Sequence, residues 1–84
     1  MFYCYILKSD INGAYYIGSC EDIANRLSQH NQRLVPATKR YIPWNLVYRQ
    51  GFDILKNARR REFQIKSWKK RSAIEKLVKT FQNF

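Results

Sequence analysis

Residues 2–18 read FYCYILKSDINGAYYIG, which is two runs of aromatic and β-branched residues separated by a polar stretch. Residues 2–7 and 14–17 have the composition of short β-strands. The polar and glycine-containing stretch 9–13 has the composition of a turn. The sequence therefore predicts that the fold opens with a β-hairpin.

A helix, a loop and a third strand are expected after the hairpin. Ser19 and Asp22 have the spacing of a capping box, which predicts a helix over residues 21–31. Residues 31–43 contain two prolines and no clean period, and we expect an irregular loop there with Thr38, Lys39 and Arg40 at its surface. Residues 44–52 alternate sufficiently to form a strand.

Two more helices are expected in the last third of the chain. Asp53 is in position to cap a helix that runs to about Lys70. Ser72 and Glu75 form a second capping-box pair. The apolar stripe of the final helix consists of Ile74, Leu77, Val78 and Phe81.

The composition indicates one small, strongly basic domain. The 84 residues are 45% hydrophobic and 15% aromatic, enough for one modest core, and we expect residues 1–84 to form a single domain. Sixteen Lys and Arg against six acidic residues give a net charge of +10. This imbalance indicates a polyanionic partner, either nucleic acid or an anionic membrane.

The location and the thiols follow from what the sequence lacks. It contains no run of eighteen apolar residues, and residues 1–7 lack the features of a signal peptide, so a cytoplasmic location is expected. Cys4 and Cys20 have only His30 as a further soft ligand. We expect free thiols, with neither a zinc site nor a disulfide framework.

Glu62 is the first candidate for chemistry. It is the only acid in the basic stretch 56–71, and it shares the inward face of its expected helix with Leu55, Ala58 and Ile65. One interpretation is an ion pair with an arginine three or four positions away. The other is a metal ligand, because a buried carboxylate is costly unless it is paired or coordinated.

Arg26 and His30 lie four positions apart and therefore project from neighbouring turns of one helix. Each has an ordinary interpretation, as a solvated arginine and as a satisfied histidine at the edge of the core. The tyrosines of the hairpin favour a phosphate site instead. Period two places Tyr3 and Tyr5 on one face of the first strand and separates the two adjacent tyrosines of the second, so only some of them can reach one site.

The order and separation of these residues resemble the GIY-YIG nuclease superfamily, over nearly the whole chain. The short bacterial branch is the most similar, through IPWNLVY at residues 42–48 and REFQIKSW at residues 61–68. In the first motif only Tyr5 matches, because Tyr3 and Cys4 stand where the name-giving motif has Gly and Ile. The motifs that carry the resemblance are Tyr3-Cys4-Tyr5, Tyr16-Ile17-Gly18, Arg26, His30 and Glu62.

The resemblance implies an α/β fold of the α+β type, with a central three-stranded antiparallel sheet flanked by helices. It also implies a metal-dependent endonuclease acting on DNA, with the catalytic residues Tyr5, Tyr16, Arg26, His30 and Glu62. Glu62 would hold one Mg²⁺ or Mn²⁺ ion, Arg26 would bind a phosphate oxygen, Tyr5 would act as the general base, and the other two would orient water and phosphate. Gly18 is expected to provide a tight turn out of its strand.

The basic surface is expected to contact phosphates without reading sequence. The seven cations chosen for this role are Lys39, Arg40, Arg59, Arg60, Lys66, Lys69 and Lys70. We expect substrate shape or a protein partner to direct the enzyme, in processing of the repair or recombination type. Two alternatives stay open: a nucleic-acid-binding module with weak or no catalysis, and, less favoured, a basic protein that docks on anionic membranes through its last helix.

Overall fold

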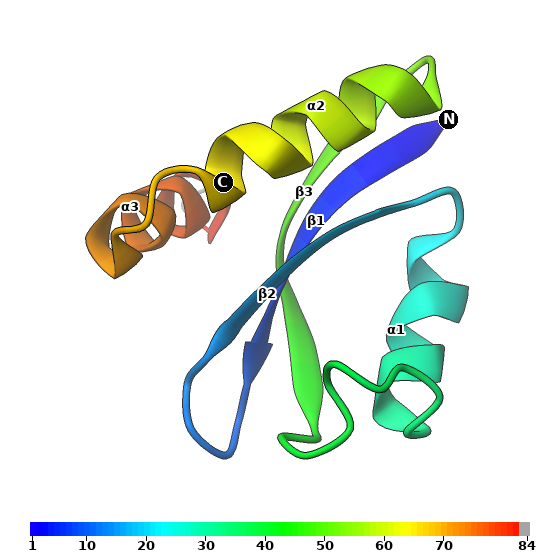
Figure 1. Cartoon of the computed structure of the whole chain (residues 1–84), viewed down its shortest axis with the longest axis vertical. Coiled ribbons are helices and arrows are strands. Elements are labelled where there is room, and N and C mark those ends of the chain that lie inside the picture. The colour runs from blue at the N-terminus through cyan, green and yellow to red at the C-terminus, as the bar shows by residue number, and fades with distance from the viewer. Residues whose placement is uncertain (83–84) are drawn as a thin grey trace.

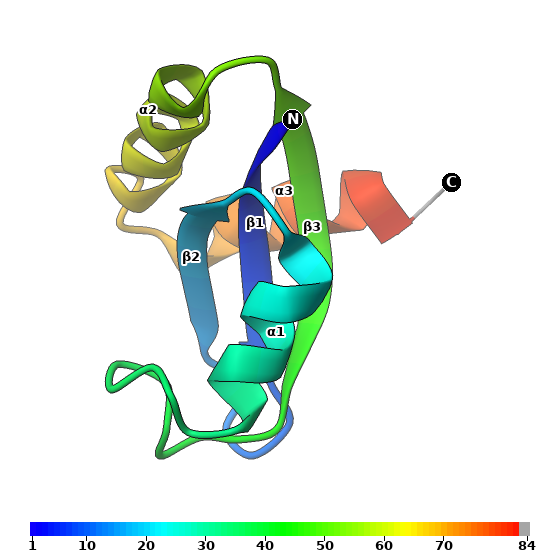
Figure 2. The same ribbon diagram turned by 90° about the vertical axis from the view of Figure 1, so that its right-hand side faces the viewer.

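The computed structural model describes residues 1–82, in which three strands form one sheet and three helices cover it. The elements in chain order are β1 (Phe2–Ser9), β2 (Tyr15–Cys20), α1 (Ile23–Asn31), β3 (Trp44–Phe52), α2 (Leu55–Lys66) and α3 (Arg71–Gln82). The sheet is antiparallel with the strand order β2-β1-β3, so β1 is central and β2 is an edge strand. Helix α1 lies on one face of the sheet, and α2 and α3 lie on the other (Figures 1 and 2). This is the expected α+β architecture.

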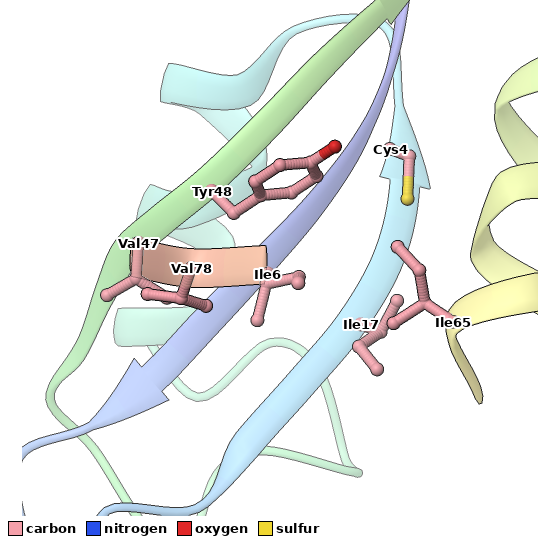
Figure 3. Packing of buried hydrophobic residues seen from close by; sticks show 7 residues of the cluster. All are labelled: Cys4, Ile6, Ile17, Val47, Tyr48, Ile65 and Val78. Atoms are coloured by element: carbon pink, nitrogen blue, oxygen red, sulfur yellow. The ribbon is translucent and has the colours of Figure 1, made fainter. Parts of the chain in front are cut away.

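The central strand sends alternate side chains into two separate cores. Cys4 and Ile6 point toward α2 and α3, and pack with Ile65 and Val78 (Figure 3). Tyr5 lies between them in sequence and points the other way, toward α1. Because both faces are covered, residues 4–7 are all buried, and the alternation expected of a half-exposed strand is lost.

A β-bulge interrupts the pairing of β1 with β3. Ile6 pairs with Tyr48 and Leu7 pairs with Leu46, so Val47 is an extra residue on β3. As a result Val47 and Tyr48 are both buried in the core beneath α3. The ends of β3 agree with the predicted range.

The predicted capping box of α1 is wrong. Ser19 belongs to β2, and its hydroxyl donates to Glu62 instead of accepting from a backbone N–H of the helix. Asp22 is the N-cap residue, and its carboxylate accepts a hydrogen bond of 3.0 Å from the backbone N–H of Asn25. The helix therefore starts at Ile23, two residues later than expected.

Helix α2 begins later and ends earlier than predicted. Its N-cap residue is Ile54, which makes no side-chain hydrogen bond, so Asp53 is not the cap. The helix ends at Lys66, and not near Lys70, because the chain turns at Lys69, whose φ of 56° is left-handed. The turn lets Trp68 pack on the core beneath α2 and α3.

Helix α3 starts at Arg71, so Ser72 lies inside its first turn and is not an N-cap. The predicted apolar stripe is confirmed: Val78 is buried, and the other three members pack against the same core. This packing uses the face that the membrane-docking alternative required. Within residues 1–82 no helix is long and apolar enough to cross a membrane. Cys4 and Cys20 are both free thiols, as expected.

Candidate active site on the edge strand

A buried chain of hydrogen bonds links β1, α1 and the loop that follows α1. The Tyr5 hydroxyl lies 2.9 Å from Nε2 of His30, and Nδ1 of His30 lies 2.7 Å from the Thr38 hydroxyl. The Thr38 hydroxyl donates onward to the backbone carbonyl of Val35 at 3.3 Å. His30 and Thr38 are completely buried, and Tyr5 is 3% exposed. The predicted His30 is thus a satisfied core residue that is also bound to the predicted Tyr5.

The partners of this chain determine where the protons lie. The Thr38 proton goes to Val35, so the Thr38 oxygen accepts from Nδ1–H of His30. With that proton on Nδ1, Nε2 of His30 carries none, so the Tyr5 hydroxyl donates to Nε2. Nε2 of His30 is then the acceptor. Tyr5 therefore has a neutral imidazole ready to receive its proton.

Burial keeps both groups neutral in the free protein. It raises the pKa of Tyr5 to about 12, against the opposing effect of the nearby Arg26. Burial, together with the charge of Arg26, lowers the pKa of His30 to about 4. The pKa of Arg26 is raised by its interaction with Tyr5. A phenolate is therefore not the resting form of Tyr5, the expected general base, at neutral pH.

Gly18 makes room for Tyr5 and is not a turn. It lies inside β2, directly paired with Tyr5. A Cβ atom at Gly18 would be 2.6 Å from the Tyr5 hydroxyl oxygen and 2.7 Å from Cζ of the same ring. The phenol lies flat against the strand because this position has no side chain, so the expected turn is replaced by a close approach.

Tyr16 and Arg26 complete the group on this face of the sheet. The Tyr16 ring meets the His30 ring edge-on, with centroids 5.0 Å apart, and packs similarly on Trp44 at 6.3 Å. Arg26 is half-buried, and its Nη1 donates to Gln29 at 3.0 Å. Four of the five predicted catalytic residues, Tyr5, Tyr16, Arg26 and His30, therefore lie together.

Glu62 lies on the other side of the edge strand. Its helix packs on the face opposite α1, and its Oε1 accepts a 2.6 Å hydrogen bond from the Ser19 hydroxyl of β2. Its other oxygen, Oε2, pairs with Lys66 one turn later in α2. The predicted ion pair therefore exists, with a lysine in place of an arginine. Ser19 follows Gly18 directly, so Tyr5 and Glu62 contact adjacent residues of β2, Tyr5 at Gly18 and Glu62 at Ser19.

The oxygen donors at Glu62 fit a hard divalent ion that keeps most of its waters. Residues 1–82 contain no group of three or more His, Cys, Asp or Glu side chains that could enclose a metal ion. Mg²⁺ is commonly held by one or two carboxylates together with substrate phosphate oxygens. The Glu62 carboxylate, oriented by Ser19, is a suitable single ligand of this kind.

The seven basic residues chosen from sequence do not form one surface. Lys66, Lys69 and Lys70 gather around the junction of α2 and α3. Arg60 lines a separate hollow beside β3, and Arg59 is also on α2. Lys39 and Arg40 belong to the loop below α1, far from α2 (Figure 1).

Sequence reasoning missed Thr38 and Ser19 as part of this arrangement. Thr38 was expected at the surface of its loop, but it is completely buried beneath Trp44, whose indole donates to the Thr38 carbonyl at 2.8 Å. Ser19 was read as a helix cap. The alternation of β2 gives a signal for Ser19, because it places Ser19 and Ile17 on the face toward α2. No local signal identifies Thr38.

Comparison with known proteins gives the family. The GIY-YIG catalytic domain matches residues 1–77, so the chain belongs to the GIY-YIG family. It is 34% identical over 74 residues to a UPF0213 protein of Staphylococcus saprophyticus, covering 87% of this chain and 89% of that protein. The solution NMR structure of a UPF0213 protein from Bacillus halodurans is similar, with a TM-score of 0.59 and 27% identity over 95% of this chain and 85% of that one.

The family defines a general expectation for the chemistry. GIY-YIG catalytic domains are associated with cleavage of nucleic-acid phosphodiesters and typically use a divalent metal ion. The two relatives carry a family designation that names no activity. The potential of this chain for nuclease activity is therefore inferred from its membership of the GIY-YIG family.

Proposed function

We propose that this protein is a metal-dependent endonuclease that hydrolyses phosphodiester bonds in DNA. The observation that carries the proposal is the buried Tyr5–His30–Thr38 chain beside Arg26. It presents a proton acceptor and a cation at one place on the β2 edge, which is what attack of water on a phosphate requires.

The two neutral groups support a relay without a free phenolate. Water attacks phosphorus and loses its proton to the Tyr5 oxygen, while the Tyr5 proton moves to Nε2 of His30. The bond from phosphorus to the leaving sugar oxygen breaks, and that oxygen takes a proton from solvent. The negative charge that grows on the phosphate counters the repulsion from Arg26 that disfavours a protonated His30.

The edge strand supports joint action from the two faces of the sheet. Tyr5 lies over Gly18 on one face, and Ser19 holds Glu62 on the other. A phosphate across this bare edge would meet Arg26 from one side and Glu62 from the other. Bound to Glu62, Mg²⁺ or Mn²⁺ would supply positive charge for the phosphate and the leaving oxygen.

We propose that substrate shape, and not base sequence, directs cleavage. Contacts to phosphates carry no sequence information, and the basic side chains of the α2–α3 junction are suited to such contacts. Structure-directed cleavage of this kind fits DNA repair or recombination. Targeting by a protein partner is compatible with the same site.

A second candidate function is a nucleic-acid-binding module with feeble catalysis. It is favoured by the pairing of Glu62 with Lys66, which occupies the carboxylate in the free protein. It is also favoured by the raised pKa of Tyr5, which leaves little phenolate at neutral pH to act as a base. Cleavage and binding must therefore be measured separately.

The test is cleavage of labelled duplex, single-stranded, flap and junction DNA with Mg²⁺ or Mn²⁺ at matched salt. Tyr5→Phe and Glu62→Gln should each lose at least about 100-fold in rate while still binding DNA. Tyr3→Phe is the matched control, because Tyr3 lies on the same face of β1 as Tyr5 but outside the hydrogen-bonded chain; its rate should stay within about twofold. Binding without cleavage by all four proteins, the wild type included, would support the binding module instead.

A further inference from the structure

A basic groove runs beside the edge strand, on the face that carries Glu62. Its volume is about 370 Å³, and it lies between β2 and the turn that joins α2 to α3. The residues that matter here are Tyr15, Lys66, Lys69, Lys70 and Arg71, which we call the basic groove. No acidic residue lines it.

The cationic side chains of the basic groove differ in how many ion pairs and hydrogen bonds they already make within the protein. Arg71 pairs with Glu75 at 2.9 Å, donates to the Gly13 carbonyl at 2.7 Å and covers the Tyr15 ring at 4.6 Å, so it is structural. Lys69 and Lys70 have no carboxylate within 4.0 Å in the part of the chain between residues 1 and 82. Two uncompensated charges at one rim of a groove attract an anion.

Lys66 belongs both to the basic groove and to Glu62. Its ammonium pairs with Oε2, the Glu62 oxygen that Ser19 does not hold, and its side chain is 47% exposed. A divalent cation on the same carboxylate would be repelled by this ammonium. When the cation binds, Lys66 must leave, and the basic groove is the surface that it already lines.

We propose that the basic groove binds the phosphodiester backbone of DNA, and that Lys66 exchanges between Glu62 in the free protein and a backbone phosphate in the complex. The idea rests on the proposed function for the metal at Glu62. A phosphate that attracts Lys66 leaves the Glu62 carboxylate free to bind the metal. A metal that displaces Lys66 from Glu62 leaves Lys66 free to bind the phosphate. The two ligands therefore bind with positive and reciprocal coupling.

The first test is Mn²⁺ binding to the whole chain without DNA, followed by paramagnetic broadening of backbone amide signals around Glu62. Lys66→Met should bind Mn²⁺ about tenfold more tightly than the wild type, because a neighbouring cation is removed. Lys56→Met is the matched control: Lys56 is exposed at the other end of α2, and its effect should stay within twofold. Glu62→Gln should abolish the broadening.

The second test is DNA binding in EDTA, where cleavage cannot interfere. The double variant Lys69→Met/Lys70→Met should bind a short duplex more weakly, with a salt slope reduced by about 2. Mn²⁺ binding is then measured in two proteins that both carry Tyr5→Phe to stop cleavage, one with Lys66 intact and one with Lys66→Met. A saturating concentration of duplex should increase the Mn²⁺ affinity more in the protein that keeps Lys66.

The outcomes separate this inference from the function on which it rests. Equal Mn²⁺ affinity for Lys66→Met and Lys56→Met would overturn the exchange of Lys66, while broadening that depends on Glu62 would keep the metal site. Absence of broadening in every protein would overturn the metal role of Glu62 and the exchange together. Unchanged DNA affinity and salt slope in the double variant would overturn the basic groove.

Discussion

The substitution Gly18→Ala tests the close approach on which the candidate site depends. A Cβ at this position would lie 2.6 Å from the Tyr5 hydroxyl oxygen, 2.7 Å from Cζ and 3.1 Å from Cε2. The ring cannot move freely, because Tyr5 is 3% exposed and hydrogen-bonded to His30. Overpacking of this kind costs about 1–3 kcal/mol, and loss of the Tyr5–His30 hydrogen bond about 1 kcal/mol. The free energy of unfolding should fall by about 2–4 kcal/mol.

Gly51→Ala is the matched control for this prediction. Gly51 is also a strand glycine, and a Cβ there would lie 2.6 Å from Sδ of Met1. That sulfur belongs to the flexible side chain of a residue that is 66% exposed, so it can move aside, and we expect a change below about 0.5 kcal/mol. Urea unfolding followed by circular dichroism measures both variants. Equal midpoints for Gly18→Ala, Gly51→Ala and the wild type would refute the argument from packing.

Three further predictions concern residues around the same site. The pKa of His30 is lowered from 6.5 to about 4, so between these pH values the unfolded chain takes up a proton that the folded protein does not. The contribution of His30 to the free energy of unfolding should therefore be greatest above pH 6.5 and fall by about 3 kcal/mol as the pH drops to 4. Urea titrations of His30→Phe should lack this pH dependence. Thr38→Val leaves the buried Nδ1–H of His30 without an acceptor and should cost about 1–3 kcal/mol in the same assay, whereas Thr38→Ser, which keeps the hydroxyl, should cost clearly less. Arg33 lies where α1 ends and has a φ of 65°; its N–H donates to the His30 carbonyl, and the Leu34 N–H donates to the Gln29 carbonyl. Arg33→Gly should raise the melting temperature by relieving about 1 kcal/mol of backbone strain. Arg33→Ala, which keeps a Cβ atom, should give no comparable gain.

The fold was largely predictable, because short-range patterns determine most of it. The hairpin, the third strand and the apolar stripe of α3 follow from local composition and period, and all three are confirmed. The helix starts were less predictable, because Ser, Asp and Glu at capping distance recur by chance in a polar segment. Ser19 shows the competition clearly: its backbone is in β2, and its hydroxyl bonds a residue 43 positions away. Only the tertiary fold decides between such alternatives.

The residues proposed for the site come from the sequence, but their arrangement could not be predicted from it. Four members lie on the α1 face, and Glu62 lies on the other, a separation that sequence spacing does not reveal. Thr38 could not be identified, because its burial depends on a loop closed by Trp44 and Asn31. The Asn31 side chain accepts from the Trp44 N–H at 2.7 Å and donates to the Trp44 carbonyl at 3.0 Å. These contacts join positions 13 apart and have no periodic signature.

The position of β2 at the edge of a three-stranded sheet explains how so small a chain can form such a site. In a central strand, neighbours on both sides would separate groups attached to the two faces. At an edge, one ligand can reach both faces, provided that no side chain blocks the way. Gly18 has no side chain, so Tyr5 can lie against the edge strand on one face of the sheet. Ser19, the next residue, forms a hydrogen bond with Glu62 on the opposite face. The burial that makes His30 part of the core also keeps it neutral and able to accept a proton, so the residues that stabilise the fold on this face are the same ones that we propose carry the reaction.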